Sequence, residues 1–258
     1  MRVRPKKHFG QHFLTNTGIA HKIANGLDCN ASQNVLEIGP GTGKLTREIL
    51  KLPCTLQAVE LDTESIEYLI ENNILPQEKI FQEDFLRMDF TQIFKDEQFS
   101  IIGNFPYNIS SQIVFKIIEN RHYIPFMTGM FQRELARRIC SPEGSKEYGI
   151  ISVITQAFYT AEYNFTVHEK EFNPPPKVKS GVITLRRKKE LYLDCDESLF
   201  ITVVKTAFNQ RRKTLSNSLK KLLNGQKLHN NFGSLRPEQL HVSEFIYLTN
   251  YIHSLAKE

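Results

Sequence analysis

Four consecutive residues, Asn104-Phe105-Pro106-Tyr107, carry the groups best suited to chemistry in this sequence of 258 residues. An exocyclic amine on a flat conjugated ring is a poor nucleophile, because its lone pair is delocalised into the ring. If the side-chain oxygen of Asn104 and the carbonyl oxygen of Pro106 accept its two N–H groups, the nitrogen is pushed toward tetrahedral geometry and the lone pair is freed. Tyr107 can stack on the ring. The segment is therefore a candidate clamp for a planar amine, although such a string alone often forms only a turn.

An apolar run at 35–38 breaks into the glycine loop Gly39-Pro40-Gly41-Thr42-Gly43, with Glu37 two residues before its first glycine. Glycines let the backbone pass close to a ligand and adopt positive φ at little cost. A dinucleotide-binding fingerprint needs a glycine at its sixth position, where this chain has Lys44. The loop runs into a predicted helix, whose N-terminus favours a carboxylate. The pattern therefore favours a loop that holds S-adenosylmethionine (SAM), whose methionine end carries that carboxylate.

Acidic residues stand at the ends of the next two predicted strands. Glu60 lies 21 residues beyond Gly39, where a carboxylate can accept both ribose hydroxyls of a nucleoside. Asp84 could accept from the adenine amine of the cofactor. With the glycine loop, three consecutive strand ends carry the groups expected of a SAM site, which the alternative of a strand-turn-helix junction with incidental acids explains less well. Together with the tetrapeptide at 104–107, the pattern predicts methyl transfer from SAM to a nitrogen on a planar group, without a strong general base.

Strand and helix patterns alternate along the first 187 residues. Strands are expected at 35–38, 55–59, 79–82, 99–103, 125–132 and 182–185. Helices are expected at 16–27, 42–50, 63–72 (with Thr63 as N-cap), 110–119, 133–139 and, from a less clear pattern, 148–159. Repeated strand–helix–strand units predict an α/β fold with a mostly parallel, doubly wound sheet that binds ligands at the carboxyl ends of its strands.

The pattern changes after Arg186. Helical patterns at 199–207, 214–223, 237–240 and 242–255 follow with few strand signals, and the basic run at 186–189 marks a boundary. We therefore expect a catalytic domain over residues 1–187 and a small all-helical domain over residues 188–258.

Composition limits the classes of function. Apolar residues make up 40% and charged residues 24%, which is ordinary for a globular protein. The four cysteines are scattered without metal-binding spacing, so a reducing, cytoplasmic location and no metal are expected. No apolar run is long enough to span a membrane, and the basic start lacks the apolar stretch of a secretory signal. The net charge is +5, and basic residues cluster at 2–7, 133–138, 177–179, 186–189, 211–213 and 220–221, which favours a polyanionic partner.

Four separated motifs resemble those of one known family in their order along the chain. They are Lys7-His8-Phe9-Gly10-Gln11-His12-Phe13-Leu14, the stretch Glu37 to Gly43, the tetrapeptide at 104–107, and Phe172-Asn173-Pro174-Pro175-Pro176-Lys177-Val178-Lys179-Ser180. The chain is similar over essentially its whole length to the KsgA/RsmA-type ribosomal RNA adenine dimethyltransferases, including the basic stretch 208–215.

This resemblance implies a Rossmann-like SAM-dependent methyltransferase domain followed by a helical domain that recognises ribosomal RNA. It implies dimethylation at N6 of two adjacent adenosines in the 3′-terminal hairpin of small-subunit (16S) rRNA, with a role in small-subunit biogenesis. The expected partner is that rRNA within a 30S precursor or particle, bound by a monomer, with neither DNA nor a membrane as partner.

The resemblance also assigns site residues. Cofactor contacts fall on His12, Leu14, Gly39, Gly41, Glu60, Asp84 and Asn104, and the catalytic group is Asn104, Pro106 and Tyr107, with Phe172 in the loop beside the target base. Two positions depart from the family's usual pattern. Phe105 stands where leucine is common, and His12 stands where most bacterial members have asparagine.

Three alternatives stay open on the sequence alone. A macrolide-resistance type of enzyme, which modifies large-subunit rRNA, is the nearest one. A DNA adenine or protein glutamine methyltransferase uses a similar tetrapeptide, but the N-terminal arm, the Phe172 loop and the helical tail argue against both. Relatives of this fold also serve as non-catalytic transcription or assembly factors, against which the intact tetrapeptide argues. The three prolines after Phe172 could also be no more than a rigid linker.

Overall fold

The computed structural model describes residues 3–6, 9–228 and 230–255, which form two compact units. The first unit is Met1–Ala136 with Thr160–Arg187, and the second is Arg137–Tyr159 with Lys188–Glu258. The second unit thus begins its long segment at residue 188, where the sequence marked a boundary, but it also contains residues 137–159. Helix α6 (Ile150–Phe158) explains the difference, because it packs against α7 (Glu197–Asn209) and α9 (Val242–Leu255) of the second unit.

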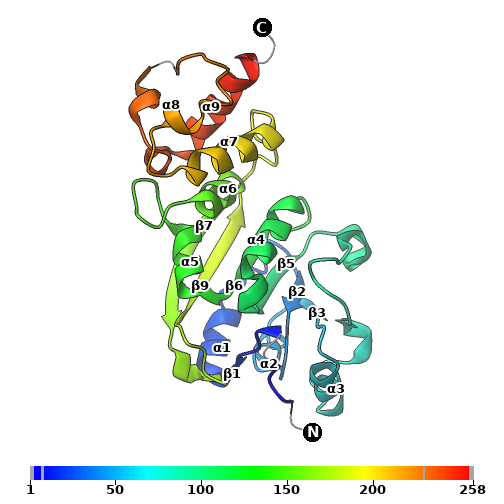
Figure 1. The fold of residues 1–258 in the computed structure, drawn as a ribbon. Coiled ribbons are helices and arrows are strands. Elements are labelled where there is room, and N and C mark those ends of the chain that lie inside the picture. Colours follow the sequence, from blue (N-terminus) through cyan, green and yellow to red (C-terminus); the bar gives the residue numbers. More distant parts are fainter. Residues whose placement is uncertain (1–2, 7–8, 229, 256–258) are drawn as a thin grey trace. The chain divides into compact units, whose positions relative to one another are not determined.

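A seven-stranded sheet forms the centre of the first unit, in the order β4-β3-β2-β5-β6-β9-β7 (Figure 1). Strands β4, β3, β2, β5 and β6 run parallel, and β9 pairs antiparallel with β6. The predicted α/β class with a mostly parallel sheet is therefore confirmed. The strands are β2 Asn34–Ile38, β3 Thr55–Val59, β4 Ile80–Phe81, β5 Ser100–Asn104, β6 Phe126–Gln132, β7 Tyr159–Val167 and β9 Ser180–Arg187.

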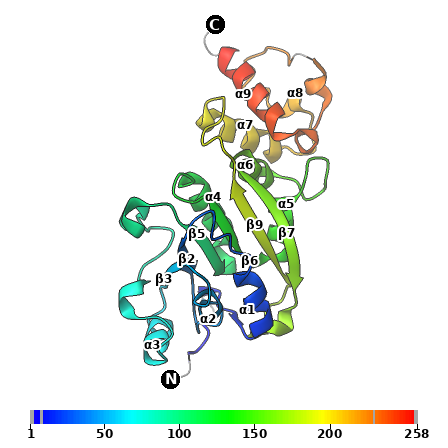
Figure 2. The ribbon, with the colours of Figure 1, turned by 180° about the vertical axis from the view of Figure 1, so that it is seen from behind.

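Helices cover both faces of this sheet. Residues of α1, α2 and α3 join one hydrophobic cluster with the strands, and α4 lies on the other face (Figures 1 and 2). The fourth helix buries Ile113, Val114, Ile117 and Ile118, which recur at helical spacing. The helices of this unit are α1 Thr17–Ala24, α2 Thr46–Ile49, α3 Thr63–Glu71 and α4 Ser110–Glu119, and α5 Arg133–Cys140 crosses into the second unit.

Several predicted boundaries were wrong. Residues 42–45 form turns, so the helix expected at 42–50 is only α2. The N-cap of α3 is Asp62 and not Thr63. Residues 159–167, which include the end of the long helix expected at 148–159, form strand β7. The alternation of buried and exposed residues along β7 is the period of two that marks a half-buried strand.

A second, two-stranded sheet joins parts of the chain that are distant in sequence. Strand β1 (Phe13–Leu14) pairs antiparallel with β8 (Phe172–Asn173), with Leu14 opposite Phe172. The N-terminal arm is thereby attached to the proline-containing loop that was expected beside the target base. Lys7 and His8, at the start of the arm motif, lie outside the described residues.

The second unit is built from helices around an aromatic core. Phe208 of α7 lies between Tyr148 and Phe245 of α9, with ring centroids 6.1 and 5.9 Å away, and Tyr148 donates a hydrogen bond to the carbonyl of Leu240. Helix α8 is Leu215–Ser218, shorter than the expected 214–223. The short 3₁₀ helices of both units are Gln77–Lys79, Phe90–Gln92, Phe94–Asp96, Tyr107–Ile109, Glu169–Glu171, Asn230–Ser234 and Pro237–Gln239. None of the helices in the described part of the chain is long and apolar enough to cross a membrane.

Candidate active site

A cavity of about 210 Å³ lies at the carboxyl ends of the parallel strands of the first unit. Strand β2 leads into Gly39, β3 into Glu60, and β5 ends at Asn104, and all three residues line the cavity. It therefore occupies the place where ligands bind in doubly wound sheets, outside the strand ends where the strand order reverses between β2 and β5.

Most of the residues expected at the site line this one cavity. They are His12, Gly39, Gly41, Glu60, Asp84, Asn104, Pro106 and Tyr107. Leu14 and Phe172 do not line it. Both are 4% exposed and belong to the hydrophobic cluster beneath the β1–β8 pair. In this structure these two side chains support the arm and the proline-containing loop, and their assigned contacts with cofactor and base stay predictions.

The glycine loop depends on backbone conformations that glycine alone adopts easily. Gly39, Gly41 and Gly43 have φ of 67°, 53° and 72°. A Cβ on Gly41 would lie 2.8 Å from the ring of Phe13, so the missing side chain also leaves room for the N-terminal arm. The loop and the arm therefore form adjoining walls of the cavity.

Glu60 is held firmly by backbone amides. Its Oε2 accepts the N–H of Gly41 at 3.1 Å, and its Oε1 accepts the N–H groups of Leu61 and Asp62, both at 2.9 Å. Burial raises the pKa of Glu60 above its usual range, although these amides oppose the shift. Since each carboxylate oxygen accepts about two hydrogen bonds, Oε2 keeps one position for a ligand hydroxyl.

Asp84 is the second acid at the cavity. Its Oδ1 accepts the N–H of Leu86 at 3.0 Å, while the one partner of its Oδ2 within the described part of the chain is the distant guanidinium of Arg87, at 3.8 Å. The free acceptors of Asp84 and Glu60, the bare glycine backbone and the exposed side chain of Leu61 fit a nucleoside cofactor that offers hydroxyl and amine donors and an apolar ring face.

Glu37 lies under the glycine loop and faces no solvent. It is 1% exposed, and its Oε2 accepts no hydrogen bond of good geometry among the described residues. Burial raises the pKa of Glu37 to about 8, opposed by the nearby Thr46 hydroxyl and assisted by the charge of Glu60. Its carboxyl group is therefore mostly protonated at neutral pH.

The amide group of Asn104 has a fixed orientation. Its Nδ2 donates to the carbonyl oxygen of His12 at 2.8 Å, which leaves Oδ1 as the free acceptor. The carbonyl oxygen of Pro106 is already engaged, because it accepts from the Ser110 hydroxyl at 2.8 Å and from the N–H of Ile109 at 3.3 Å.

Phe105 differs from Pro106 in this respect. Its N–H donates to the carbonyl of Met130, but its own carbonyl oxygen accepts no hydrogen bond from the described residues. Its ring is 1% exposed and lies 4.7 Å from that of Phe131. A Cβ on Gly129 would come within 2.3 Å of the Phe105 ring, so this glycine makes room for an aromatic residue at position 105.

Tyr107 and His12 lie side by side at the cavity. Their ring centroids are 5.3 Å apart, with 31° between the planes. The Tyr107 hydroxyl shares a hydrogen bond of 2.5 Å with the fully buried Ser180, and burial raises the pKa of Tyr107. His12 Nδ1 donates to the carbonyl of Pro174 at 2.8 Å, since a carbonyl can only accept. No separate pattern in the sequence indicated a role for Ser180, which is the last residue of the proline-containing motif.

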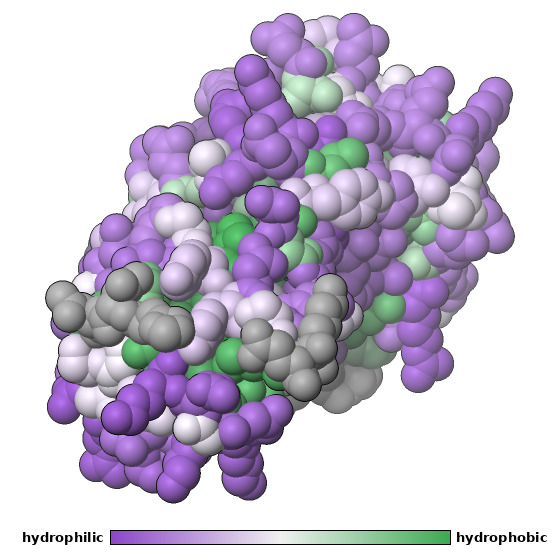
Figure 3. Space-filling view, turned by 90° about the horizontal axis from the view of Figure 1, so that it is seen from above, coloured by the Kyte–Doolittle hydropathy of each residue, from purple (hydrophilic) through white to green (hydrophobic). Residues whose placement is uncertain are grey.

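The basic cluster at 211–213 lies in the second unit, at an open surface depression lined by residues 208–213. Arg212 and Lys213 are exposed, whereas Arg211 donates to the carbonyl of Ser145 and lies 3.7 Å from Glu238. The face seen in Figure 3 is mostly hydrophilic, with hydrophobic residues in small separate patches. Within the described ranges, no group of three or more His, Cys, Asp or Glu residues could hold a metal ion.

Comparison with known proteins gives concordant matches. The model of a family described as ribosomal RNA adenine dimethylase matches residues 2–250. The chain is 55% identical to ribosomal RNA small subunit methyltransferase A of Flavobacterium johnsoniae over 98% of this chain and 97% of that protein. It is 49% identical to the protein of the same name from Bacteroides thetaiotaomicron, over 99% and 96%.

Two solved structures share the fold. A dimethyladenosine transferase from Plasmodium falciparum has a TM-score of 0.80 and 24% identity, covering 94% of this chain and 98% of that chain. The 23S rRNA methyltransferase ErmE has a TM-score of 0.67 and 25% identity, covering 92% and 99%.

Proposed function

The chain belongs to the ribosomal RNA adenine dimethylase family, and we propose that it is the SAM-dependent enzyme that dimethylates N6 of two adjacent adenosines in the 3′-terminal hairpin of 16S rRNA. Relatives at 48–55% identity carry the small-subunit name, whereas the large-subunit enzyme ErmE is 25% identical. The macrolide-resistance alternative is therefore the less supported one.

The orientation of Asn104 carries this proposal. Because its Nδ2 donates to the His12 carbonyl, the amide is oriented with Oδ1 left as an acceptor for a substrate, and an adenine N6 amine offers N–H donors to such an acceptor. Asn104 thus accepts one amine proton and helps to localise the lone pair on nitrogen. Bound SAM supplies the electrophilic methyl group and a good leaving group.

A second acceptor completes the clamp. The sequence favoured the carbonyl of Pro106, but that oxygen already accepts two hydrogen bonds, from Ser110 and Ile109. We assign the second acceptor to the carbonyl of Phe105, which lines the same cavity and accepts none from the described residues. After transfer the alkylated nitrogen is acidic, so the clamp needs no strong base nearby.

Tyr107 provides the stacking surface for the target base. An adenine must leave its helix to reach a cavity of this kind, and aromatic side chains commonly hold extruded bases. Ser180 holds the hydroxyl end of Tyr107 and His12 covers one ring face, so the ring is preoriented for a base on its other face. Phe172 supports the loop that holds His12 through Pro174.

The basic clusters provide the polyanion contacts of the proposal. Arg137, Arg138, Arg212 and Lys213 are exposed on the second unit, and Arg211 is half-buried beside them. Backbone contacts position a protein without specifying bases, so shape recognised over a wide surface would select the substrate. We therefore propose a 30S precursor or particle as the substrate, bound in the cytoplasm by a monomer.

The test is methyl transfer from tritiated SAM to defined substrates. Precursor small subunits that lack the modification, naked 3′-terminal hairpin RNA, 23S rRNA and DNA are compared under one salt condition. We expect labelling of the small-subunit precursor at two adjacent adenosines, with dimethyladenosine as the final product. Preferential labelling of 23S rRNA would establish the macrolide-resistance alternative, and no transfer to any substrate would establish a non-catalytic binder.

A further inference from the structure

Asp62 is a buried carboxylate that the proposed reaction does not use. It is 1% exposed and occupies the N-cap position of α3, directly after the Glu60-Leu61 segment that lines the cavity. An aspartate at this position normally accepts a backbone N–H from the first turn of the helix. The Asp62 side chain makes no such capping bond. Its acceptors are therefore available for other partners.

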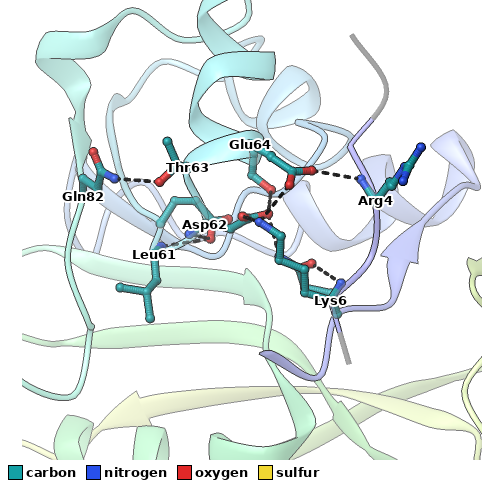
Figure 4. A network of polar contacts seen from close by, with 10 residues as sticks. Arg4, Lys6, Leu61, Asp62, Thr63, Glu64 and Gln82 are labelled. Carbon is teal, nitrogen blue, oxygen red and sulfur yellow. Dashed lines mark hydrogen bonds and ion pairs between the residues drawn. The ribbon is translucent and has the colours of Figure 1, made fainter. Parts of the chain in front are cut away.

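Those partners come mainly from the N-terminal arm. Lys6 Nζ forms a hydrogen-bonded ion pair with Asp62 Oδ1, and Gln11 Nε2 donates to Oδ2 at 3.2 Å (Figure 4 shows Lys6 and its acidic partners). The Ser65 hydroxyl also donates to Oδ2, at 2.9 Å. Burial alone would raise the pKa of Asp62, but these hydrogen bonds outweigh it and lower the pKa below its usual value.

The same arm forms a wall of the cavity. Phe9, Gly10, Gln11, His12 and Phe13 all line it. Beyond Gln11 the arm is tied to the opposite side, because the His12 carbonyl accepts from Asn104 and β1 pairs with β8. Residues 9–13 thus cross the cavity, and Asp62 holds this segment on the side of the cavity where β3 ends.

Asp62 also contacts Glu60, in this case through its backbone. Its backbone N–H donates to Glu60 Oε1 at 2.9 Å, so the residue that holds the arm also orients the acid expected to bind the cofactor ribose. A shift of Asp62 would therefore disturb two walls of the cavity at once.

We propose that Asp62 is a positioning residue that fastens the N-terminal arm across the cofactor cavity through Lys6 and Gln11, and thereby sets the affinity for SAM without touching it. The inference rests on the proposed function only in taking SAM as the ligand. Charge-assisted hydrogen bonds at a buried acceptor hold such a segment more firmly than an exposed ion pair does.

The test replaces either side of the contact in the full-length protein. Lys6→Met removes the charge and keeps a side chain of similar length, and Asp62→Asn keeps the shape of its partner. Arg4→Met is the matched control, since it removes one charge from the same arm. Among the contacts of the described residues, Arg4 meets Glu64 through its backbone N–H alone, at 3.5 Å. Glu64→Gln is the second control, because Glu64 lies 3.1 Å from Lys6 but is partly exposed.

Calorimetry with SAM measures the affinity. We expect about a tenfold loss for Lys6→Met and for Asp62→Asn, which corresponds to about 1.4 kcal/mol, and less than twofold for both controls. The double variant should lose little more than either single one, because both remove the same contact. If Lys6→Met binds SAM as tightly as Arg4→Met does, Asp62 does not set the affinity.

Hydrogen exchange gives a readout without cofactor. The amides of residues 9–13 should exchange faster in Lys6→Met than in Arg4→Met, while β2 and β5 exchange as in the wild type. Unchanged arm exchange would overturn the inference. If Asp62→Asn does not fold, the partly exposed Lys6 still provides the test. Failure of the wild type to transfer methyl groups would instead contradict the proposed function, whatever the arm does.

Discussion

The side-chain amide of Asn104 donates a hydrogen bond of 2.8 Å to the backbone carbonyl of His12, a residue 92 positions earlier in the chain. This contact decides which end of the Asn104 amide can meet a substrate, because the nitrogen is engaged and the oxygen is not. It also makes the N-terminal arm part of the proposed reacting centre, although the side chains of the arm supply no group that the proposed chemistry consumes.

Asn104→Ala tests the amine clamp. The variant loses an acceptor that matters most in the transition state, and we expect turnover to fall by about 10²–10³, by analogy with removal of one oxyanion-hole donor. Single-turnover methylation of the precursor particle measures the rate, and filter binding shows whether rRNA affinity is kept. Turnover within tenfold of the wild type would mean that Asn104 does not hold the amine.

Tyr107→Phe and Ser180→Ala remove the same hydrogen bond from its two ends. A neutral hydrogen bond contributes about 1 kcal/mol. Each variant should therefore slow turnover by roughly fivefold, because the ring of Tyr107 is held less firmly. The double variant should be no slower than the worse single one. The Michaelis constant for SAM should not change in any of the three variants. If the loss of turnover in the double variant equals the product of the two single losses, the two residues act separately.

The sequence predicted the sheet and the cavity better than the arm. Strands β2 and β3 follow from short stretches whose apolar residues are buried, and the glycine loop after β2 and the acid after β3 mark the ligand edge wherever such strands are parallel. The positions of Gly39, Glu60 and Asn104 at one cavity follow from local patterns and one topological rule.

Contacts between distant segments could not be predicted in the same way. The β1–β8 pair contains only two residues on each strand, too few to show a period. Phe172 lies in the core because Leu14 pairs with it, a partner 158 positions away that no local pattern indicates. The carbonyl of Pro106 is occupied by Ser110 and Ile109, and hydrogen bonds of this kind depend on the folded backbone and leave no pattern in the sequence.

The raised pKa of Glu37 predicts that stability falls as pH rises. The unfolded chain releases this proton near 4.5, whereas the folded protein keeps it to about pH 8. Between these values the folded state binds more protons, so the free energy of unfolding decreases with pH, by up to a few kcal/mol. Glu37→Gln, which cannot ionise, should flatten most of this slope in urea titrations at pH 5 to 8. An unchanged slope would show that Glu37 is ionised in the folded protein.

Gly129→Ala tests the space under the tetrapeptide. A Cβ there would come within 2.3 Å of the Phe105 ring and 2.7 Å of the Gly103 carbonyl oxygen, and overpacking of this kind costs about 1–3 kcal/mol. We expect a lower thermal midpoint, partly restored by a second change, Phe105→Leu, which shortens the side chain. Gly149→Ala is the control, because its added Cβ would have no neighbour nearer than 3.9 Å. If Phe105→Leu restores none of the thermal midpoint lost in Gly129→Ala, the added Cβ does not clash mainly with the Phe105 ring.

Arg212 and Lys213 test the polyanion contacts of the second unit. Both are exposed, whereas Arg211 is held by the Ser145 carbonyl near Glu238, so the exposed pair is better placed to meet phosphates. Replacing both by glutamine should weaken binding to the precursor particle and reduce the slope of log affinity against log salt by about 1.4–1.8, since each phosphate contact contributes about 0.7–0.9. Lys220 and Lys221, exposed in the same unit, give a control with the same charge change. SAM affinity should not change in either variant. Equal salt slopes for the two double variants would show that net charge, and not this cluster, attracts the RNA.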